Sequence, residues 1–277
     1  MTPPKRPRLI SRITWITTAI YNYRSGFRMP ADLLDDETRK MMPGWDVYER
    51  LDIYYTSVVQ ELLAEAAADT VALVQHLVPT YTRYTAGAAR LRRVLYYLER
   101  TFIKKAVFKG RGWLACGDIN MNEWMRADHW QLNVKANYGD LVTAKLKKWG
   151  WEKGEPQDIL ALAESCAEAA SGSNCIIPLA SLARRRFRAQ VLEPLLGPDA
   201  NMSAKQGEGG PSGSEGRLES AVKELIESTD GAGKEKIRLA KDVAHMLKTC
   251  GVQPDHPVRK RLDDHIGMKT YRAPADA

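Results

Sequence analysis

The feature of this sequence that most constrains its fold is a helical repeat of apolar residues within residues 80–106. Four of them recur at spacings of four, three and four residues, which places them on one face of a helix: Leu91, Leu95, Leu98 and Phe102. Basic residues surround this stripe along the same segment: Arg90, Arg92, Arg93, Arg100, Lys104 and Lys105. The pattern predicts a helix with one apolar side and basic residues around it.

Similar spacing elsewhere predicts an all-α chain. Residues 10–24 predict a first helix, and residues 46–69 predict a long one. The apolar residues of that long helix have the spacing of a helix that packs along another helix. We expect the stripe at 91–102 to pack against four of them: Tyr48, Leu51, Tyr55 and Val58.

Residues 70–106 predict either two helices or one bent helix. Pro79 removes a backbone hydrogen bond and would kink the helix, and Gly87 is expected to separate its two parts. The alternating apolar runs that are typical of strands are scarce along the whole chain.

Residues 109–176 differ in composition from the rest of the chain, because most of its tryptophans lie there. They are Trp113, Trp124, Trp130, Trp149 and Trp151. Helix-like stretches occur near residues 121–132, 138–149 and 156–170. Two explanations stay open: the segment folds onto the helical bundle, or it is an unspliced or mispredicted part of the gene.

Tails and linkers are indicated by composition. Residues 1–9 are Pro-rich and basic, which predicts a disordered tail. Residues 197–216 are rich in Gly and Ser, which predicts a flexible linker. The remaining predicted segments are a helix within 177–196, a helix pair within 217–268 that breaks at residues 231–233, and a tail at 269–277.

The chain has 277 residues, a net charge of +7 and a pI of about 9.2, and it is long enough to bury a substantial core. Some basic residues gather in the runs 3–8, 184–188 and 258–261. We interpret these runs as solvated helix faces and, at 3–8, as a nuclear-localisation signal. A basic stripe that binds nucleic acid or an acidic partner is the alternative.

The spacing of the cysteines and the hydropathy of the chain indicate its cellular compartment. The four cysteines are scattered without paired spacing: Cys116, Cys166, Cys175 and Cys250. The sequence contains no secretory signal and no stretch of the ~20 apolar residues that span a bilayer. We therefore expect free thiols in a reducing compartment, cytoplasmic or nuclear, and no membrane partner.

Motifs for catalysis or ligand binding are incomplete. Residues 118–129 begin like a calcium loop, but Glu123 replaces its Gly and His129 its final Glu. Residues 231–235 resemble part of a phosphate loop, but the leading Gly and the Ser or Thr after Lys234 are missing. The five histidines lack metal-ligand spacing. We expect no enzyme activity, no metal and no cofactor.

A longer motif runs through residues 81–105. Tyr81, Tyr84 and Leu91 are followed by the unbroken run from Tyr97 to Lys105. This order resembles the second helical repeat of the cullins, which reads roughly W-x-x-Y, S-x-x-L and Y-L-N-R-H-W-V-R-R-E. Further segments that resemble the family in the same order are residues 12–23, 47–63, 180–195 and 218–251.

The sequence also departs from the cullin pattern. Glu99 stands where the family has the Asn of Y-L-N-R, and Phe187 stands where the third repeat has Trp. The family's first helix has no counterpart. Residues 109–176 replace a short link, so the template implies that the helical core does not need them. Segments like the family's C-terminal half, with its RING-protein site and modified lysine, do not occur in this sequence.

The resemblance implies cullin-repeat-like antiparallel helical bundles that form a short stalk, with residues 10–108 as the first repeat region. It implies a non-catalytic scaffold that binds a substrate adaptor of a ubiquitin ligase complex, in ubiquitin-dependent protein catabolism, without a RING subunit. The adaptor-binding residues carried over from the family are Ile13, Thr17, Tyr21, His76, Thr80 and Tyr84. The alternative is a basic helical module that binds nucleic acid or protein, although scattered basic residues count against nucleic acid.

Overall fold

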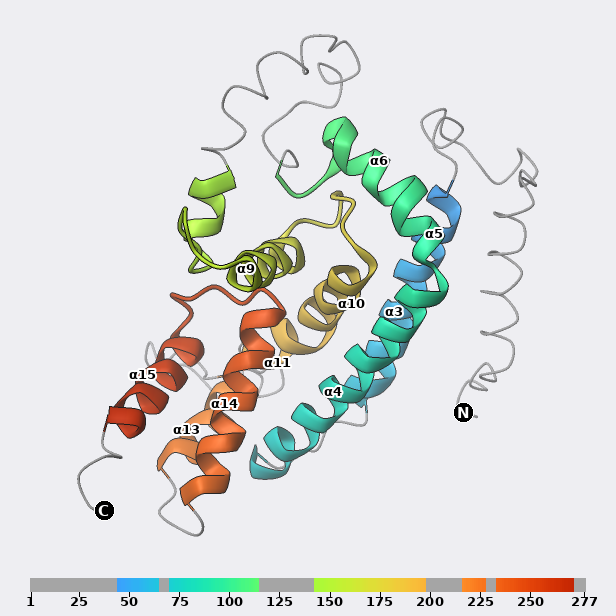
Figure 1. The fold of residues 1–277 in the computed structure, drawn as a ribbon. Coiled ribbons are helices and arrows are strands. Elements are labelled where there is room, and N and C mark those ends of the chain that lie inside the picture. Colours follow the sequence, from blue (N-terminus) through green and yellow to red (C-terminus); the bar gives the residue numbers. More distant parts are fainter. Residues whose placement is uncertain (1–43, 65–69, 115–141, 198–215, 228–232, 272–277) are drawn as a thin grey trace, which may run out of the picture.

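A computed structural model of the chain describes residues 44–64, 70–114, 142–197, 216–227 and 233–271. These residues form helices and no strand, so the all-α prediction is confirmed for them (Figure 1). The predicted tail at 1–9, the predicted helix at 10–24 and most of the predicted linker at 197–216 lie outside the described residues.

The basic segment forms one nearly continuous helical run. α4 (Thr70–Val94) passes through Pro79 and Gly87, so the separation predicted at Gly87 is wrong. A single Gly costs a helix only about 1 kcal/mol, which the buried residues on either side offset. The run leaves regular helical geometry at Leu95, where ψ is 20°. It continues as α5 (Tyr96–Leu98), η2 (Glu99–Ile103), α6 (Lys104–Ala106) and η3 (Val107–Arg111), of which η2 and η3 are π-helical turns.

α3 (Trp45–Ala64) packs against this run, as the two apolar stripes predict. Six of the eight predicted contact residues are buried: Tyr48, Leu51, Tyr55, Leu95, Leu98 and Phe102. The ring centroids of Tyr48 and Phe102 lie 5.8 Å apart. Leu91 and Val58 are partly buried, and Val59 occupies the fully buried position next to Val58. The spacing therefore predicts the packed faces correctly to within one residue.

The centre of the bundle is α10 (Leu179–Phe187), which η4 (Arg188–Leu192) and α11 (Glu193–Leu196) continue. α10 contacts α3, α4 and α9 (Gln157–Ala170). Its buried residues are Leu179, Ser181, Leu182, Ala183, Arg185 and Phe187. The interpretation of residues 184–188 as a solvated face is wrong, because neighbouring helices surround this segment.

Three helices, and not the predicted pair, form the C-terminal part of the described chain. They are α13 (Arg217–Glu227), α14 (Gly233–Thr249) and α15 (Pro257–Tyr271). α13 and α14 contact α4, and α15 packs against both of them (Figure 1). The unpredicted boundary includes Gly251, which has a φ of 79°. A Cβ on Gly251 would lie 2.5 Å from the backbone nitrogen of Ala170, so only glycine permits this approach to α9.

Residues 142–176 pack onto the bundle. The helix at 142–147 and α9 share a small apolar core made of Leu146, Trp149, Ala163, Cys166 and Ala167. Cys175 and Ile176 belong to the main core, and the N–H of Ile176 donates to the carbonyl of Arg111 at 2.8 Å. The main core therefore includes the end of segment 109–176, contrary to the expectation that the whole segment is dispensable.

Candidate interaction surface

The predicted adaptor-binding residues that the structure describes all lie on α4. Thr80 and Tyr84 are buried, and His76 is partly buried. The Thr80 hydroxyl lies 3.4 Å from His76 Nε2, and the Tyr84 hydroxyl donates to the carbonyl of Ala183 at 3.0 Å. The other predicted residues lie outside the described chain: Ile13, Thr17 and Tyr21. In this fold Thr80 and Tyr84 support the core and are not exposed to a partner.

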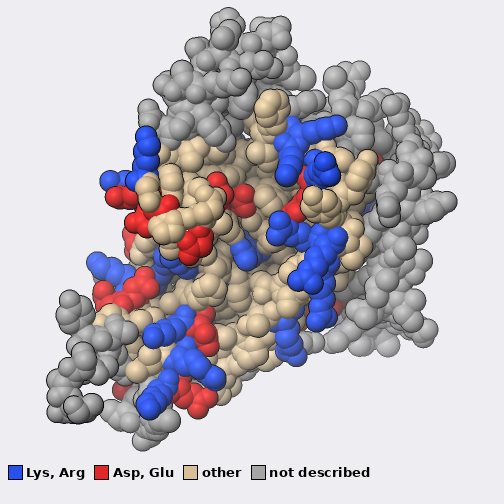
Figure 2. All heavy atoms as spheres, viewed as in Figure 1, with Lys and Arg blue, Asp and Glu red and all other residues tan. Residues whose placement is uncertain are grey.

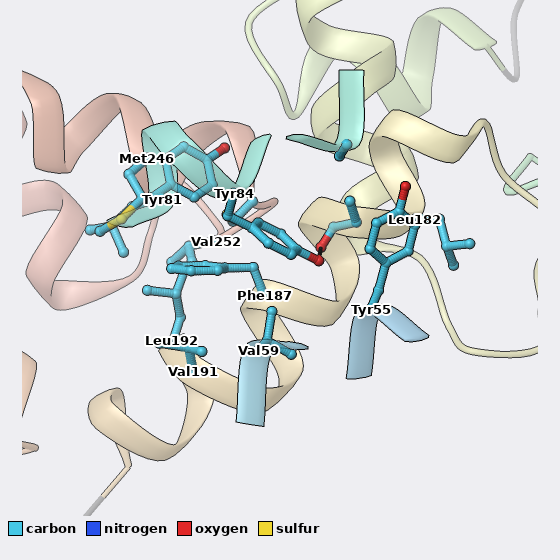
Figure 3. Close-up of a cluster of buried hydrophobic side chains, with 14 of the residues drawn as sticks. Tyr55, Val59, Tyr81, Tyr84, Leu182, Phe187, Val191, Leu192, Met246 and Val252 are labelled. Carbon is cyan, nitrogen blue, oxygen red and sulfur yellow. Dashed lines mark hydrogen bonds between the residues drawn. The ribbon is translucent and has the colours of Figure 1, made fainter. Parts of the chain in front are cut away.

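Tyr84 belongs to an aromatic cluster between α3, α4 and α10 (Figure 3). Its ring centroid lies 6.1 Å from that of Tyr55 and 5.6 Å from that of Phe187. The Tyr81 ring lies 5.0 Å from Phe187, and its hydroxyl bonds that of Thr249 at 2.7 Å. Burial raises the pKa of the Tyr55, Tyr81 and Tyr84 hydroxyls well above the usual value for tyrosine. These phenols stay neutral and stabilise the bundle.

The arginines of α10 are bound within the fold. The Arg185 guanidinium donates to the carbonyls of Gly172 and Cys175 at 2.7 and 2.9 Å. Two further arginines reach neighbouring helices: Arg184 bonds Ser165 of α9, and Arg186 pairs with Asp52 of α3. These bonds hold α3, α9 and the loop before α10 against the central helix.

The basic residues of the α4–α6 run have the opposite environment. Seven cations are exposed to solvent there: Arg83, Arg90, Arg92, Arg93, Arg100, Lys104 and Lys105. Figure 2 shows Lys and Arg side chains gathered over this run, whereas both signs of charge are mixed over other elements of the same view. We call the exposed side of residues 83–108 the basic ridge.

Four large apolar side chains are exposed on the basic ridge. The exposed fractions are 69% for Val94, 60% for Tyr96, 56% for Tyr97 and 76% for Phe108. Elsewhere in the described residues, Ile53 of α3 is the one other large apolar residue of this kind. Single exposed apolar residues are ordinary, but a group of them indicates a contact surface. Tyrosine suits such a surface because it has an apolar ring and a polar tip.

Glu99 is the one acidic residue between positions 70 and 111, and it is buried. Its carboxylate accepts hydrogen bonds from Arg92 Nε at 2.8 and 3.0 Å, and from the N–H of Leu179 at 3.3 Å. Leu179 begins α10, where backbone N–H groups lack helical acceptors. Glu99 therefore joins the run to α10 and is balanced by Arg92, so the ridge has no exposed acidic side chain.

Positive charge is concentrated in this part of the chain. Residues 83–111 contain nine Lys and Arg and one Glu, a net charge of +8, whereas the whole chain has +7. The rest of the chain therefore has a net charge of −1. On α14 the signs are mixed, and Arg238 lies 3.4 Å from Glu235. Among the described residues, positive charge is thus most concentrated on the basic ridge.

Other described residues bear on metal binding, on the protonation of the cysteine thiols and on membrane insertion. Within the described ranges, no three His, Cys, Asp or Glu side chains are placed to hold a metal ion. Burial raises the pKa of Cys166, and it raises that of Cys250 to about 12, so both thiols stay protonated at neutral pH. None of the described helices is long and apolar enough to cross a membrane.

Comparison of the chain with models of known families, with curated proteins and with solved structures finds no match. The interpretation of this surface therefore depends on its own residues. The sequence alone could have indicated the basic ridge, because it contains a single acidic residue between positions 70 and 111. The net charge of the whole chain conceals this signal because it averages over every segment.

Proposed function

We propose that this chain is a non-catalytic helical scaffold that binds a protein partner along the basic ridge. One observation carries the proposal: seven cations and four large apolar side chains are exposed on one helical run that has no exposed acid. The cations attract an acidic surface and orient it. The apolar side chains supply area whose burial stabilises a complex.

A helix surface that served only solubility would have a different composition. Oppositely charged residues one turn apart stabilise a helix by about 0.2–0.5 kcal/mol per pair, and like charges destabilise it by similar amounts. Arg90 and Arg93 are like charges at such a spacing, as are Arg100 and Lys104. They reduce the stability of the free chain, and an acidic partner would relieve that repulsion.

The bundle gives the ridge a rigid support. Leu98 and Phe102 are buried in the core, while Val94 and Tyr97 on the same run are exposed. Because the inner side is already packed, the backbone of the ridge needs little ordering when a partner binds. Such preorganisation lowers the entropy cost of association.

The test is affinity purification from the native source with the full chain as bait. We expect at least one co-purifying protein whose recovery falls about tenfold or more, roughly 1.4 kcal/mol of binding, in the double variant Arg93→Glu/Arg100→Glu. The matched control Lys234→Glu/Lys241→Glu makes the same change of charge at exposed positions of α14 and should keep the partner. Recovery of the same proteins by all three baits would contradict the proposal.

A substrate adaptor of a cullin-type ubiquitin ligase is the finer form of this proposal. The resemblance of the sequence to cullin repeats supports it, and so does the all-helical character of the described residues. Because Thr80 and Tyr84 are buried, we place the contact on the basic ridge and not on those residues.

The same purification tests the adaptor. Adaptor subunits should be present in the eluate of the unchanged bait and depleted in that of Arg93→Glu/Arg100→Glu. Ridge-dependent partners that include no adaptor would overturn this finer form and leave the ridge as a contact surface.

A further inference from the structure

We infer that the element recognised by the basic ridge is an acidic amphipathic helix, an inference that rests on the proposed function. Its first basis is the spacing of the exposed residues. Two lines of positions repeat at intervals of seven: Arg83, Arg90, Tyr97 and Lys104 in one, and Val94, Thr101 and Phe108 in the other. An interval of seven residues is the repeat of a helical surface that packs along a second helix. Val94 and Phe108, on either side of the π-helical turn η2, are both exposed.

The second basis is the apolar content of these lines. Val94 and Tyr97 are one helical turn apart, and Phe108 lies further along the run. The Thr101 hydroxyl, between them, donates to the carbonyl of Tyr97 at 2.7 Å and needs no outside acceptor. Val94 and Phe108 are 14 positions apart along the run, on either side of the π-helical turn η2. Apolar side chains that recur along a partner helix could therefore cover this stripe.

The third basis is charge. Arg93 and Arg100 lie next to the apolar line, also seven residues apart, and Arg90 and Lys104 lie in the other line. Carboxylates on a partner helix that recur every three, four or seven residues would meet these cations at matching intervals. A partner helix with an apolar stripe between acidic flanks complements both the apolar and the charged residues of the ridge.

A single-stranded nucleic acid fits the same surface less well. Such ligands are bound in positively charged grooves with aromatic rings on which the bases stack. The basic ridge does expose aromatic rings, those of Tyr96, Tyr97 and Phe108, but it is the exposed side of a helix and not a groove. Residues 83–111 also contain no Asn, Gln, Ser, Asp or His to recognise base edges. Oligonucleotide binding is therefore the competing outcome.

The experiment measures binding of fluorescent probes to the full chain by anisotropy at about 0.15 M ionic strength. The main probe is a synthetic peptide of about three heptads, with Leu at the first and fourth position of each heptad and Glu at most others. The second probe is a scrambled peptide of the same composition, and the third is an oligothymidylate of about the same charge. We expect the amphipathic peptide to bind about tenfold or more tightly than either of the others.

Matched variants locate the binding. Val94→Ala/Tyr97→Ala should weaken binding of the amphipathic peptide about fivefold or more, because interface anchors contribute more than 1 kcal/mol. Ile53→Ala, which trims an exposed apolar side chain of α3, should leave binding unchanged. Arg93→Glu/Arg100→Glu should abolish binding, and Lys234→Glu/Lys241→Glu should not. Circular dichroism and thermal unfolding of each variant check that it stays folded.

Each remaining outcome overturns the inference in a distinguishable way. Equal binding of the scrambled peptide would mean that charge alone is recognised. Tighter binding of the oligothymidylate, lost in Arg93→Glu/Arg100→Glu, would assign the ridge to nucleic acid. If none of the probes binds a folded chain, the acidic-helix inference fails, while the purification described above still decides whether the ridge holds a partner.

Discussion

α10 and the basic ridge are both helical and rich in arginine, and they have opposite environments. In α10, Arg185 is buried and bonds two backbone carbonyls. On the ridge, Arg93 and Arg100 are exposed. The phenylalanines of the two segments differ in the same way: Phe187 of α10 is fully buried, whereas Phe108 of the ridge is mostly exposed.

The difference shows when an arginine stabilises the fold instead of remaining on the surface. A guanidinium can be buried only where acceptors replace its water, because desolvating a charge costs several kcal/mol. Residues 171–178 are not helical, and Arg185 bonds two of their carbonyls, those of Gly172 and Cys175. Buried backbone carbonyls need donors in turn. Arg185 thus satisfies the loop, whereas the ridge cations have no comparable need within the fold.

The largest expected difference between the two segments concerns their phenylalanines. Phe187→Ala should lower the free energy of unfolding by about 3–5 kcal/mol, because it removes a fully buried ring packed on Tyr81 and Tyr84. Phe108→Ala should change it by less than about 0.5 kcal/mol. Urea denaturation of both variants measures the contrast, and similar losses would show that Phe108 is part of the core.

The contrast between buried and exposed side chains also occurs within the ridge helix itself. Leu98→Ala should cost about 2–5 kcal/mol, because this side chain is buried among the residues of the main core. Val94→Ala, one turn earlier, should cost less than about 0.5 kcal/mol. Denaturation midpoints of the two variants test the face assignment. A loss under about 0.5 kcal/mol for Leu98→Ala would mean that the inner side of the run has been assigned incorrectly.

The arginines of the two segments should differ by a smaller amount in their contribution to the free energy of unfolding. Arg185→Ala should destabilise the chain by about 2–4 kcal/mol, because the carbonyls of Gly172 and Cys175 lose their donors inside the bundle. Arg93→Ala should be nearly neutral for stability. Thermal unfolding of the two variants at one ionic strength compares them. Equal effects would remove the distinction between structural and surface arginines.

The smallest expected effect depends on pH. Burial raises the pKa of Glu168, which bonds Ser181 of α10, from the usual 4.5 to about 7. Between these values the folded chain holds a proton that the unfolded chain has lost, so this group lowers stability as pH rises through the window. Glu168→Gln removes the effect. The unchanged chain should lose about 1–2 kcal/mol more than Glu168→Gln between pH 5 and pH 8.

Urea denaturation at several pH values between 5 and 8 measures this difference directly. Glu168→Gln keeps an acceptor for the Ser181 hydroxyl, so the two chains should be nearly equally stable at the acidic end. Parallel stability curves across the whole range would show that Glu168 is hydrated in the folded chain. A steeper loss in Glu168→Gln would contradict the sign of the effect.

The sequence by itself determined the all-helical character of the described residues and the buried faces of α3 and of the run that continues α4. Apolar periodicity is a local property, so it correctly predicted that Leu95, Leu98 and Phe102 are buried and that Phe102 meets Tyr48 of α3. It also predicted the helix at 156–170 to within one residue. Of the candidate surface, it indicated the cations around the stripe. It did not indicate which tyrosines are exposed, because Tyr84 and Tyr97 look alike to a pattern that does not include the partners of their hydroxyls.

The tertiary structure alone decided which polar residues are inside. Arg186 pairs with Asp52, which is 134 positions away, and Tyr84 donates to Ala183, 99 positions away. The local spacing of residues contains no information about such long-range contacts. The close approach of Gly251 to α9, which marks the boundary before α15, is also a long-range contact. Whether a charged or aromatic residue serves the core or a partner depends on the acceptors that folding brings to it, because burial without them is too costly.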